Sequence, residues 1–157
     1  MPMALMQWSE KMSVGIPELD ADHKELIRVI NQLAADANEA GRLGAVRQSL
    51  FALLRYAEFH FAREEKVMAV CRHIGIEEHK REHRDFVDRI GELNRRFDQD
   101  PDGSAQVVNE ALLQFLQDWL NHHILIEDKA YRTAAEASPE ARQAAKSFNA
   151  IEIWWSG

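Results

Sequence analysis

Two histidines of the segment HKREH, His79 and His83, lie four positions apart, with Glu82 directly before the second. Four positions turn by about 40° on a helix, so both imidazoles can reach one metal ion. His60 and Glu64 have the same spacing and can share an ion in the same way. Both segments therefore predict helices that ligate a metal.

Three further donors, His23, His123 and Asp128, come from other parts of the chain. His123 and Asp128 are five positions apart, and on an ideal helix their side chains diverge by about 140°. Either the helix is locally widened there, or Asp128 is not a ligand. Spacing alone makes Asp128 the weakest member of the set.

These seven donors are more than one tetrahedral zinc ion can use. Two octahedral ions that share both carboxylates and a bridging oxygen species would be filled by the set except at one position. Imidazole together with carboxylate suits iron among the redox metals. The donor set therefore favours a di-iron site with one open coordination position.

Prolines and glycines punctuate the chain and leave four stretches that predict helices, at residues 20–39, 44–71, 76–98 and 104–132. Within each stretch, apolar residues recur every three or four positions, which is the period of a helix that buries one face. The sequence carries no strand signals such as alternating β-branched runs. It therefore predicts an all-α fold, an up-down-up-down four-helix bundle formed by residues 1–132.

The metal donors interrupt these apolar stripes at positions that should face the core. In the third stretch, for example, His79 and His83 precede Phe86 and Ile90 on one helical face. A buried carboxylate without a partner is unfavourable, so several donors that converge need a compensating cation. The interior of a helical bundle is where such sites are built from facing helices.

Residues 133–157 are predicted to form a C-terminal extension, a short helix that packs on the bundle. Ser138 is a favourable N-cap and Pro139 suits the first helical position. Ala141, Ala145 and Phe148 would share one face of this helix. Near the end, Trp154 and Trp155 are expected either to pack on the bundle or to form a patch for a protein partner or a second subunit.

Composition narrows the possible classes of protein. The 157 residues suit one domain with a buried core. A net charge of −7 without a basic run argues against nucleic acid as a partner. The single cysteine, Cys71, excludes an intramolecular disulfide and a cysteine-based zinc cluster. The N-terminal MPMALMQW lacks a charged region and is too short for a signal peptide or a membrane span, so a cytoplasmic protein without membrane insertion is expected.

Two other metal-site classes fit less well. HKREH matches the H-x-x-E-H pattern of inverzincin proteases, in which the glutamate is the general base. On a helix, however, Glu82 turns away from the stripe and toward solvent with Arg81 and Asp85. Ferritin-type oxidases use Glu-x-x-His pairs, and the sequence contains no such pair. His73, His122 and Glu65 fall off the stripes and are expected at the surface.

The segments WSEKMSVGIPELDADHKEL, HFAREEKVM, HKREHRDF and WLNHHILIEDKAY closely resemble the hemerythrin family, in particular its single-domain bacterial members. The resemblance covers about residues 8 to 131. It implies a non-heme di-iron centre, two iron ions (Fe2+/Fe3+) with an oxo or hydroxo bridge, that takes O2 as its ligand. The residues that it implies are His79, His83 and His123 on the filled iron, His23 and His60 on the iron that binds O2, and Glu64 and Asp128 as bridges.

Apolar residues flank the ligand positions and are predicted to wall the O2 pocket: Leu26, Phe61, Trp119, Leu120 and Ile124. A dry pocket withholds the protons that would release bound O2 as peroxide, and the sequence places no hydroxyl or acid there as a proton donor. The predicted function is reversible O2 binding for storage, delivery or scavenging, rather than catalysis. The alternatives are an O2 or nitric oxide sensor that acts through a partner, and a di-iron peroxidase or nitric oxide reductase.

Overall fold

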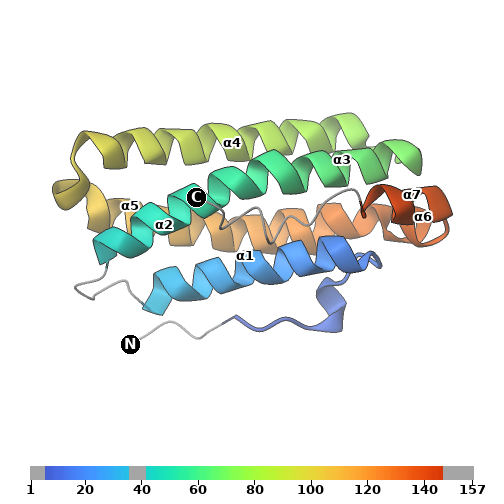
Figure 1. The fold of residues 1–157 in the computed structure, drawn as a ribbon, viewed down its shortest axis with the longest axis horizontal. Helices are drawn as coiled ribbons and strands as arrows, with labels where there is room; N and C mark the ends of the chain where they lie inside the picture. Colours follow the sequence, from blue (N-terminus) through green and yellow to red (C-terminus); the bar gives the residue numbers. More distant parts are fainter. Residues whose placement is uncertain (1–5, 36–41, 147–157) are drawn as a thin grey trace.

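The computed structural model of the chain describes residues 6–35 and 42–146. In these two ranges every regular element is helical, and no strand occurs. Four long helical rods run side by side along the molecule, each antiparallel to the one before it (Figure 1). The predicted all-α, up-down-up-down four-helix bundle is therefore confirmed.

The rods are built from several helical elements that continue into one another. The first is α1 and the third is α4, whereas the second joins α2 to α3 and the fourth continues α5 through shorter turns. A 3-10 turn, η1, precedes the first rod. The bounds are η1 Glu10–Met12, α1 Pro17–Ala35, α2 Arg42–Arg55, η2 Tyr56–His60, α3 Phe61–Val70, α4 Ile76–Gln99, α5 Pro101–Trp119, η3 Leu120–Asp128, η4 Lys129–Tyr131 and α6 Arg132–Glu136.

The first and fourth rods begin three residues earlier than the sequence predicts, and proline is the reason. Pro17 and Pro101 are the first residues of α1 and α5, a position where the missing N–H of proline removes no helical hydrogen bond. The Asp100 side chain then caps α5 by accepting a hydrogen bond from Gly103 N at 3.1 Å. Residues 36–39, where the first helix was expected to end, lie outside the described residues.

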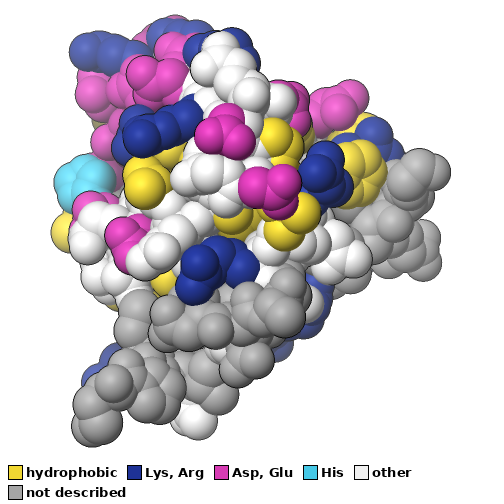
Figure 2. Space-filling view, turned by 90° about the vertical axis from the view of Figure 1, so that its left-hand side faces the viewer, with side chains coloured by type: hydrophobic (Ala, Val, Ile, Leu, Met, Phe, Trp, Pro, Cys, Tyr) yellow, Lys and Arg dark blue, Asp and Glu magenta, His cyan; other side chains and the backbone are white. Residues whose placement is uncertain are grey.

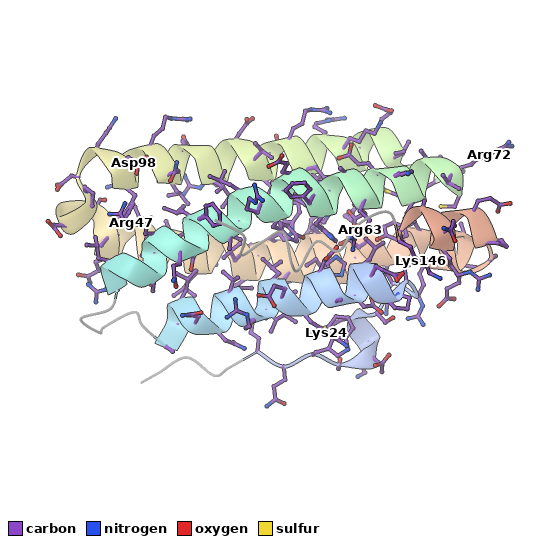
Figure 3. All side chains as sticks on the ribbon, in the orientation of Figure 1. Lys24, Arg47, Arg63, Arg72, Asp98 and Lys146 are labelled. Atoms are coloured by element: carbon purple, nitrogen blue, oxygen red, sulfur yellow. The ribbon has the colours of Figure 1, made fainter. Side chains whose placement is uncertain are left out.

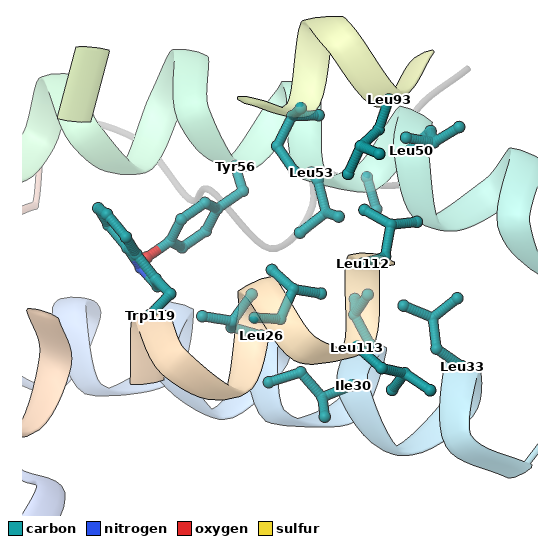
Figure 4. Close-up of a cluster of buried hydrophobic side chains, with 14 of the residues drawn as sticks. Leu26, Ile30, Leu33, Leu50, Leu53, Tyr56, Leu93, Leu112, Leu113 and Trp119 are labelled. Atoms are coloured by element: carbon teal, nitrogen blue, oxygen red, sulfur yellow. The ribbon is translucent and has the colours of Figure 1, made fainter. Parts of the chain in front are cut away.

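The apolar stripes of the rods meet in one core. Leu26, Leu53, Phe86 and Leu112 are each fully buried there, one from each rod. Figure 4 shows part of this cluster, with Tyr56 and Trp119 at one end. These two rings stack on His60 and His123. A second, smaller cluster, which includes Val67, lies at the far side of the metal donors. The histidines therefore sit between two apolar layers.

A short helix, α7 (Pro139–Ala144), follows α6 at the end of the bundle where α3 also ends (Figure 1). Its cap is the one expected, because Ser138 Oγ accepts a hydrogen bond from Ala141 N at 3.1 Å. Ala141 and Ala145 are buried in the second cluster. The remainder of the predicted extension, including Phe148, Trp154 and Trp155, lies outside the described residues, and the division of the chain at residue 132 stays a prediction.

The surface mixes charges of both signs. On the end of the bundle shown in Figure 2, acidic and basic side chains alternate, and the described residues of that face form no continuous basic patch. In the described ranges no helix combines the length and the apolar character that a membrane span requires.

Candidate metal centre

Two rods contain π-helical turns next to the histidines, η2 (Tyr56–His60) and η3 (Leu120–Asp128). In a π-helix the hydrogen bonds run from i to i+5, so residues five apart come to lie on one side. In η3 this brings His123 Nε2 within 3.0 Å of Asp128 Oδ1. Of the two possibilities that spacing left open for Asp128, the structure shows the widened helix.

All seven donors predicted from the sequence converge on one buried point between the rods. Glu64 is at the centre. Its Oε1 lies 2.8 Å from both His79 Nε2 and His83 Nε2, and 3.7 Å from His123 Nε2. Its Oε2 faces the other way, 3.5 Å from His60 Nε2 and 3.7 Å from His23 Nε2. We call His79, His83 and His123 the three-histidine group, and His23 and His60 the two-histidine group.

Asp128 divides its oxygens between the same two groups. Its Oδ1 lies 2.8 Å from His79 Nε2 and 3.0 Å from His123 Nε2, and its Oδ2 lies 3.2 Å from His23 Nε2. Each carboxylate therefore presents one oxygen to each group.

In the absence of a metal, the site is a cluster of histidinium and carboxylate groups. Burial opposes protonation of His23, but Asp128 and Glu64 outweigh it and raise its pKa to about 10. Against burial, the same carboxylates raise the pKa of His79 to about 10 and that of His123 to about 9. Burial alone would raise the pKa values of Glu64 and Asp128, yet the surrounding imidazoles hold both below their usual range.

The hydrogen-bond geometry indicates that cations, rather than protons, fit this cluster. Nε2 of His23, His60 and His123 and both oxygens of Asp128 are buried without a well-aligned hydrogen-bond partner. Buried polar atoms are normally paired, and here the orphaned ones point at one another. Imidazole nitrogens and carboxylate oxygens are suitable ligands for iron and zinc. The residues thus fit two metal ions.

Three carboxylates orient imidazoles by accepting hydrogen bonds from Nδ1, the ring nitrogen that faces away from the cluster. For two of these carboxylates the sequence-based prediction was wrong. The Nδ1–H of His83 donates to Glu65 Oε2 at 2.8 Å, and the Nδ1–H of His123 donates to Glu82 Oε2 at 2.6 Å. Glu65 and Glu82 were expected to be solvated surface residues, but packing of α3 on α4 and of α4 on η3 turns them toward the site. Such bonds fix the tautomer that leaves Nε2 free for a metal.

The third carboxylate, Asp22, is one that the sequence did not single out. It accepts from His60 Nδ1 at 2.7 Å and from Arg63 Nη1 at 3.3 Å. Arg63 is only 2% exposed and lies within the bundle, unlike Arg72 at its end (Figure 3). Asp22 and Arg63 each lie next to a predicted ligand in the sequence, and their side chains are about 100° away from the ligand stripe on the helix. Only this adjacency could have indicated their role from the sequence.

A hydroxyl is also present, contrary to expectation. Tyr131 OH donates to Glu64 Oε2 at 3.0 Å. Burial and the neighbouring Glu64 and Asp128 raise the pKa of Tyr131 well above its usual value. It therefore keeps its proton at neutral pH and acts as a hydrogen-bond donor to Glu64.

The residues predicted to wall an O2 pocket are all buried in the core beside the site: Leu26, Phe61, Trp119, Leu120 and Ile124. Phe61 stacks on His83 at 3.8 Å between ring centroids, and Trp119 stacks on His123 at 3.9 Å. Their role in holding O2 stays a prediction. His73 lies in a loop and His122 is exposed, so both stay outside the buried cluster as expected.

We expect Asp22→Asn to weaken metal binding at the two-histidine group by about 10–100-fold, because an outer carboxylate orients His60 and increases its basicity. Calorimetric titration of the metal-free protein with Zn2+ measures this, with one of two binding events weakened. Asp88→Asn removes the same charge from an exposed position of α4 and is the matched control. Unchanged affinity in Asp22→Asn would contradict the orienting role.

The fold and the site define a helical-bundle protein with a buried histidine and carboxylate site for cations. A family profile described as "Hemerythrin HHE cation binding domain" matches residues 14–135. The chain belongs to the hemerythrin family, which confirms the resemblance found in its sequence segments.

Named relatives cover most of the chain. A bacteriohemerythrin of Stenotrophomonas maltophilia is 30% identical over 135 residues, which are 86% of this chain and 84% of the relative. A bacteriohemerythrin of Methylococcus capsulatus is 32% identical over 130 residues, 82% of this chain and 95% of the relative. Myohemerythrin-1 of Phascolopsis gouldii is 29% identical over 125 residues, 80% and 90% of the two chains.

Proposed function

We propose that this protein holds two iron ions in the buried cluster and binds O2 reversibly, as a store or carrier. The main observation behind the proposal is the orientation of the two carboxylates. Glu64 and Asp128 each direct one oxygen toward the three-histidine group and the other toward the two-histidine group. The names of the relatives, bacteriohemerythrin and myohemerythrin, support it.

The two groups differ in their number of imidazoles, and this difference supports a proposal for where O2 binds. Three imidazoles and two carboxylate oxygens would nearly fill one octahedral ion, whereas the two-histidine group supplies one imidazole fewer. O2 is therefore proposed to bind on the side of His23 and His60. If bound, an iron pair would supply electrons to O2 on binding and take them back on release.

The remaining residues keep the site dry and fixed. Apolar neighbours such as Leu26 and Ile124 exclude water, and with it a supply of protons. Tyr131 holds Glu64 in place through its hydroxyl. Asp22, Glu65 and Glu82 hold three of the imidazoles. None of these groups is arranged as a nucleophile, so we propose a binding protein rather than an enzyme. With its single cysteine it suits a reducing compartment, and the cytoplasm is the proposed location.

The proposal predicts reversible absorption bands. The iron-loaded protein, reduced without oxygen, should develop new visible bands on exposure to O2 and lose them when O2 is removed under vacuum. Protein loaded with Zn2+, which has no redox chemistry, is the control and should show no bands. Bands that settle once into a resting ferric spectrum would favour an oxidising enzyme, and the absence of any O2-dependent band would exclude a di-iron carrier.

A further inference from the structure

The π-helix η3 carries two histidine and carboxylate pairs, and only one of them points inward. His123 and Asp128 face the buried cluster, while His122 and Glu127, one position earlier, face outward. The outer pair has the same spacing of five, and the wide turn brings it together in the same way. His122 Nε2 lies 3.9 Å from Glu127 Oε1.

Glu82 of α4 completes this outer cluster. Its Oε1 lies 3.6 Å from His122 Nε2, while its Oε2 is the acceptor for His123 Nδ1. One ligand atom from each of Glu82, His122 and Glu127 lies within 4.8 Å of the others. Donors bonded at about 2.0–2.2 Å to one ion have comparable spacings. A small cation can therefore bind all three with little movement.

We propose that Glu82, His122 and Glu127 form a separate surface site, the outer site, for one divalent transition-metal ion. One imidazole and two carboxylates suit Zn2+ or Fe2+, with water in the remaining positions. The site is open to solvent, since the side chains of His122 and Glu127 are 63% and 32% exposed. The two carboxylates balance the charge of the ion.

The position of the outer site gives it a role in loading the interior. A pocket of about 270 Å³ reaches from Glu82 and His122 to the interior residue His123. Asp85 and Asp118 also line it and add negative charge that attracts cations. Glu82 contacts both the outer cluster and His123, so an ion on the outer site is one side chain away from the buried cluster. The outer site is thus a landing site, which binds an ion first before the ion moves to the buried cluster. This role rests on the proposed function, in which the interior holds metal.

Counting ions tests the outer site without O2 or iron. Equilibrium dialysis of the protein against Zn2+ should give one bound ion more than His122→Ala/Glu127→Gln, whatever number the interior holds. Glu82 is left intact because it also holds His123. Glu77→Gln removes an exposed charge from α4 and should bind as many ions as the original protein. Equal counts in the original protein and the double variant would overturn the outer site.

Uptake kinetics test the landing role. Metal-free protein mixed with Co2+ develops visible absorption as the ion enters the buried ligands, and the double variant should do so several-fold more slowly than Glu77→Gln. Circular dichroism checks that the exposed substitutions leave the helices intact. If one ion is lost but the uptake rate is unchanged, the landing role is wrong. A failure of reversible O2 binding would leave both of these measurements, and the outer site, standing.

Discussion

Glu64→Gln is expected to abolish the binding of a metal pair. Glu64, like Asp128, presents one oxygen to each of the two histidine groups. Glutamine keeps the shape of the side chain but lacks the negative charge and cannot bridge two cations. The loss of metal affinity should be larger than the loss of about 10–100-fold that follows when a hydrogen-bond partner behind a ligand is removed. Metal analysis after dialysis against iron or Zn2+ should show that the paired occupancy is gone.

The matched control is Glu65→Gln, at the next position of α3. Glu65 accepts a hydrogen bond from His83 Nδ1, on the side of the ring opposite Nε2, so this variant should retain both ions and lose affinity at the three-histidine group alone. Circular dichroism of the metal-free variants shows whether each still folds. If Glu64→Gln bound two ions as tightly as Glu65→Gln, the bridging role of Glu64 would be wrong.

The metal-free protein is expected to lose thermal stability as the pH rises from 7 to 10. The folded-state pKa values of His23 and His79 are about 10 and that of His123 is about 9, all above the ordinary value of 6.5. The stability that these histidines contribute is fully present below pH 6.5 and is lost as the pH passes through 9 to 10. Above that, Glu64 and Asp128 are buried charges without counter-charges.

Because the same two carboxylates raise all three pKa values, the contributions do not add, and together they represent on the order of a few kcal/mol of unfolding free energy. Since each kcal/mol moves the Tm of a chain this size by roughly 2–4 °C, the Tm should fall by about 10 °C. Thermal melts of metal-free and Zn2+-loaded protein over this pH range measure the effect. The loaded protein is the control, because its imidazoles carry metal instead of protons while its surface groups titrate identically. Parallel curves for the two forms would contradict the histidinium cluster.

Much of the fold follows from short-range properties of the sequence. The predicted helix at residues 76–98 is α4, Ile76–Gln99, because its stripe of apolar residues is regular and its ends are marked by Gly75 and Pro101. The pairs His60/Glu64 and His79/His83 were identifiable for the same reason, since a spacing of four fixes a shared face on any α-helix.

The sequence alone did not decide whether Asp128 is a ligand. A π-turn is a change in hydrogen-bond register, and no local sequence pattern here predicts it. The widened turn of η3 coincides with contacts of His123 and Asp128 to the other rods, which a sequence pattern does not reveal. The same turn creates the outer pair, so His122, set aside as a surface residue, acquires a proposed role from its neighbours.

The partners behind the ligands were decided entirely by tertiary packing. Glu65 and Glu82 lie off the apolar stripes, and helical periodicity assigns such positions to solvent. Whether they meet solvent or a histidine depends on how closely the next rod approaches, which is a property of contacts between residues distant in sequence. The sequence by itself thus indicated four helices and the donors on them, with Asp128 left open by its spacing. The tertiary structure decided how three of the five imidazoles are held, because the Nδ1 partners of His60, His83 and His123 come from other helices.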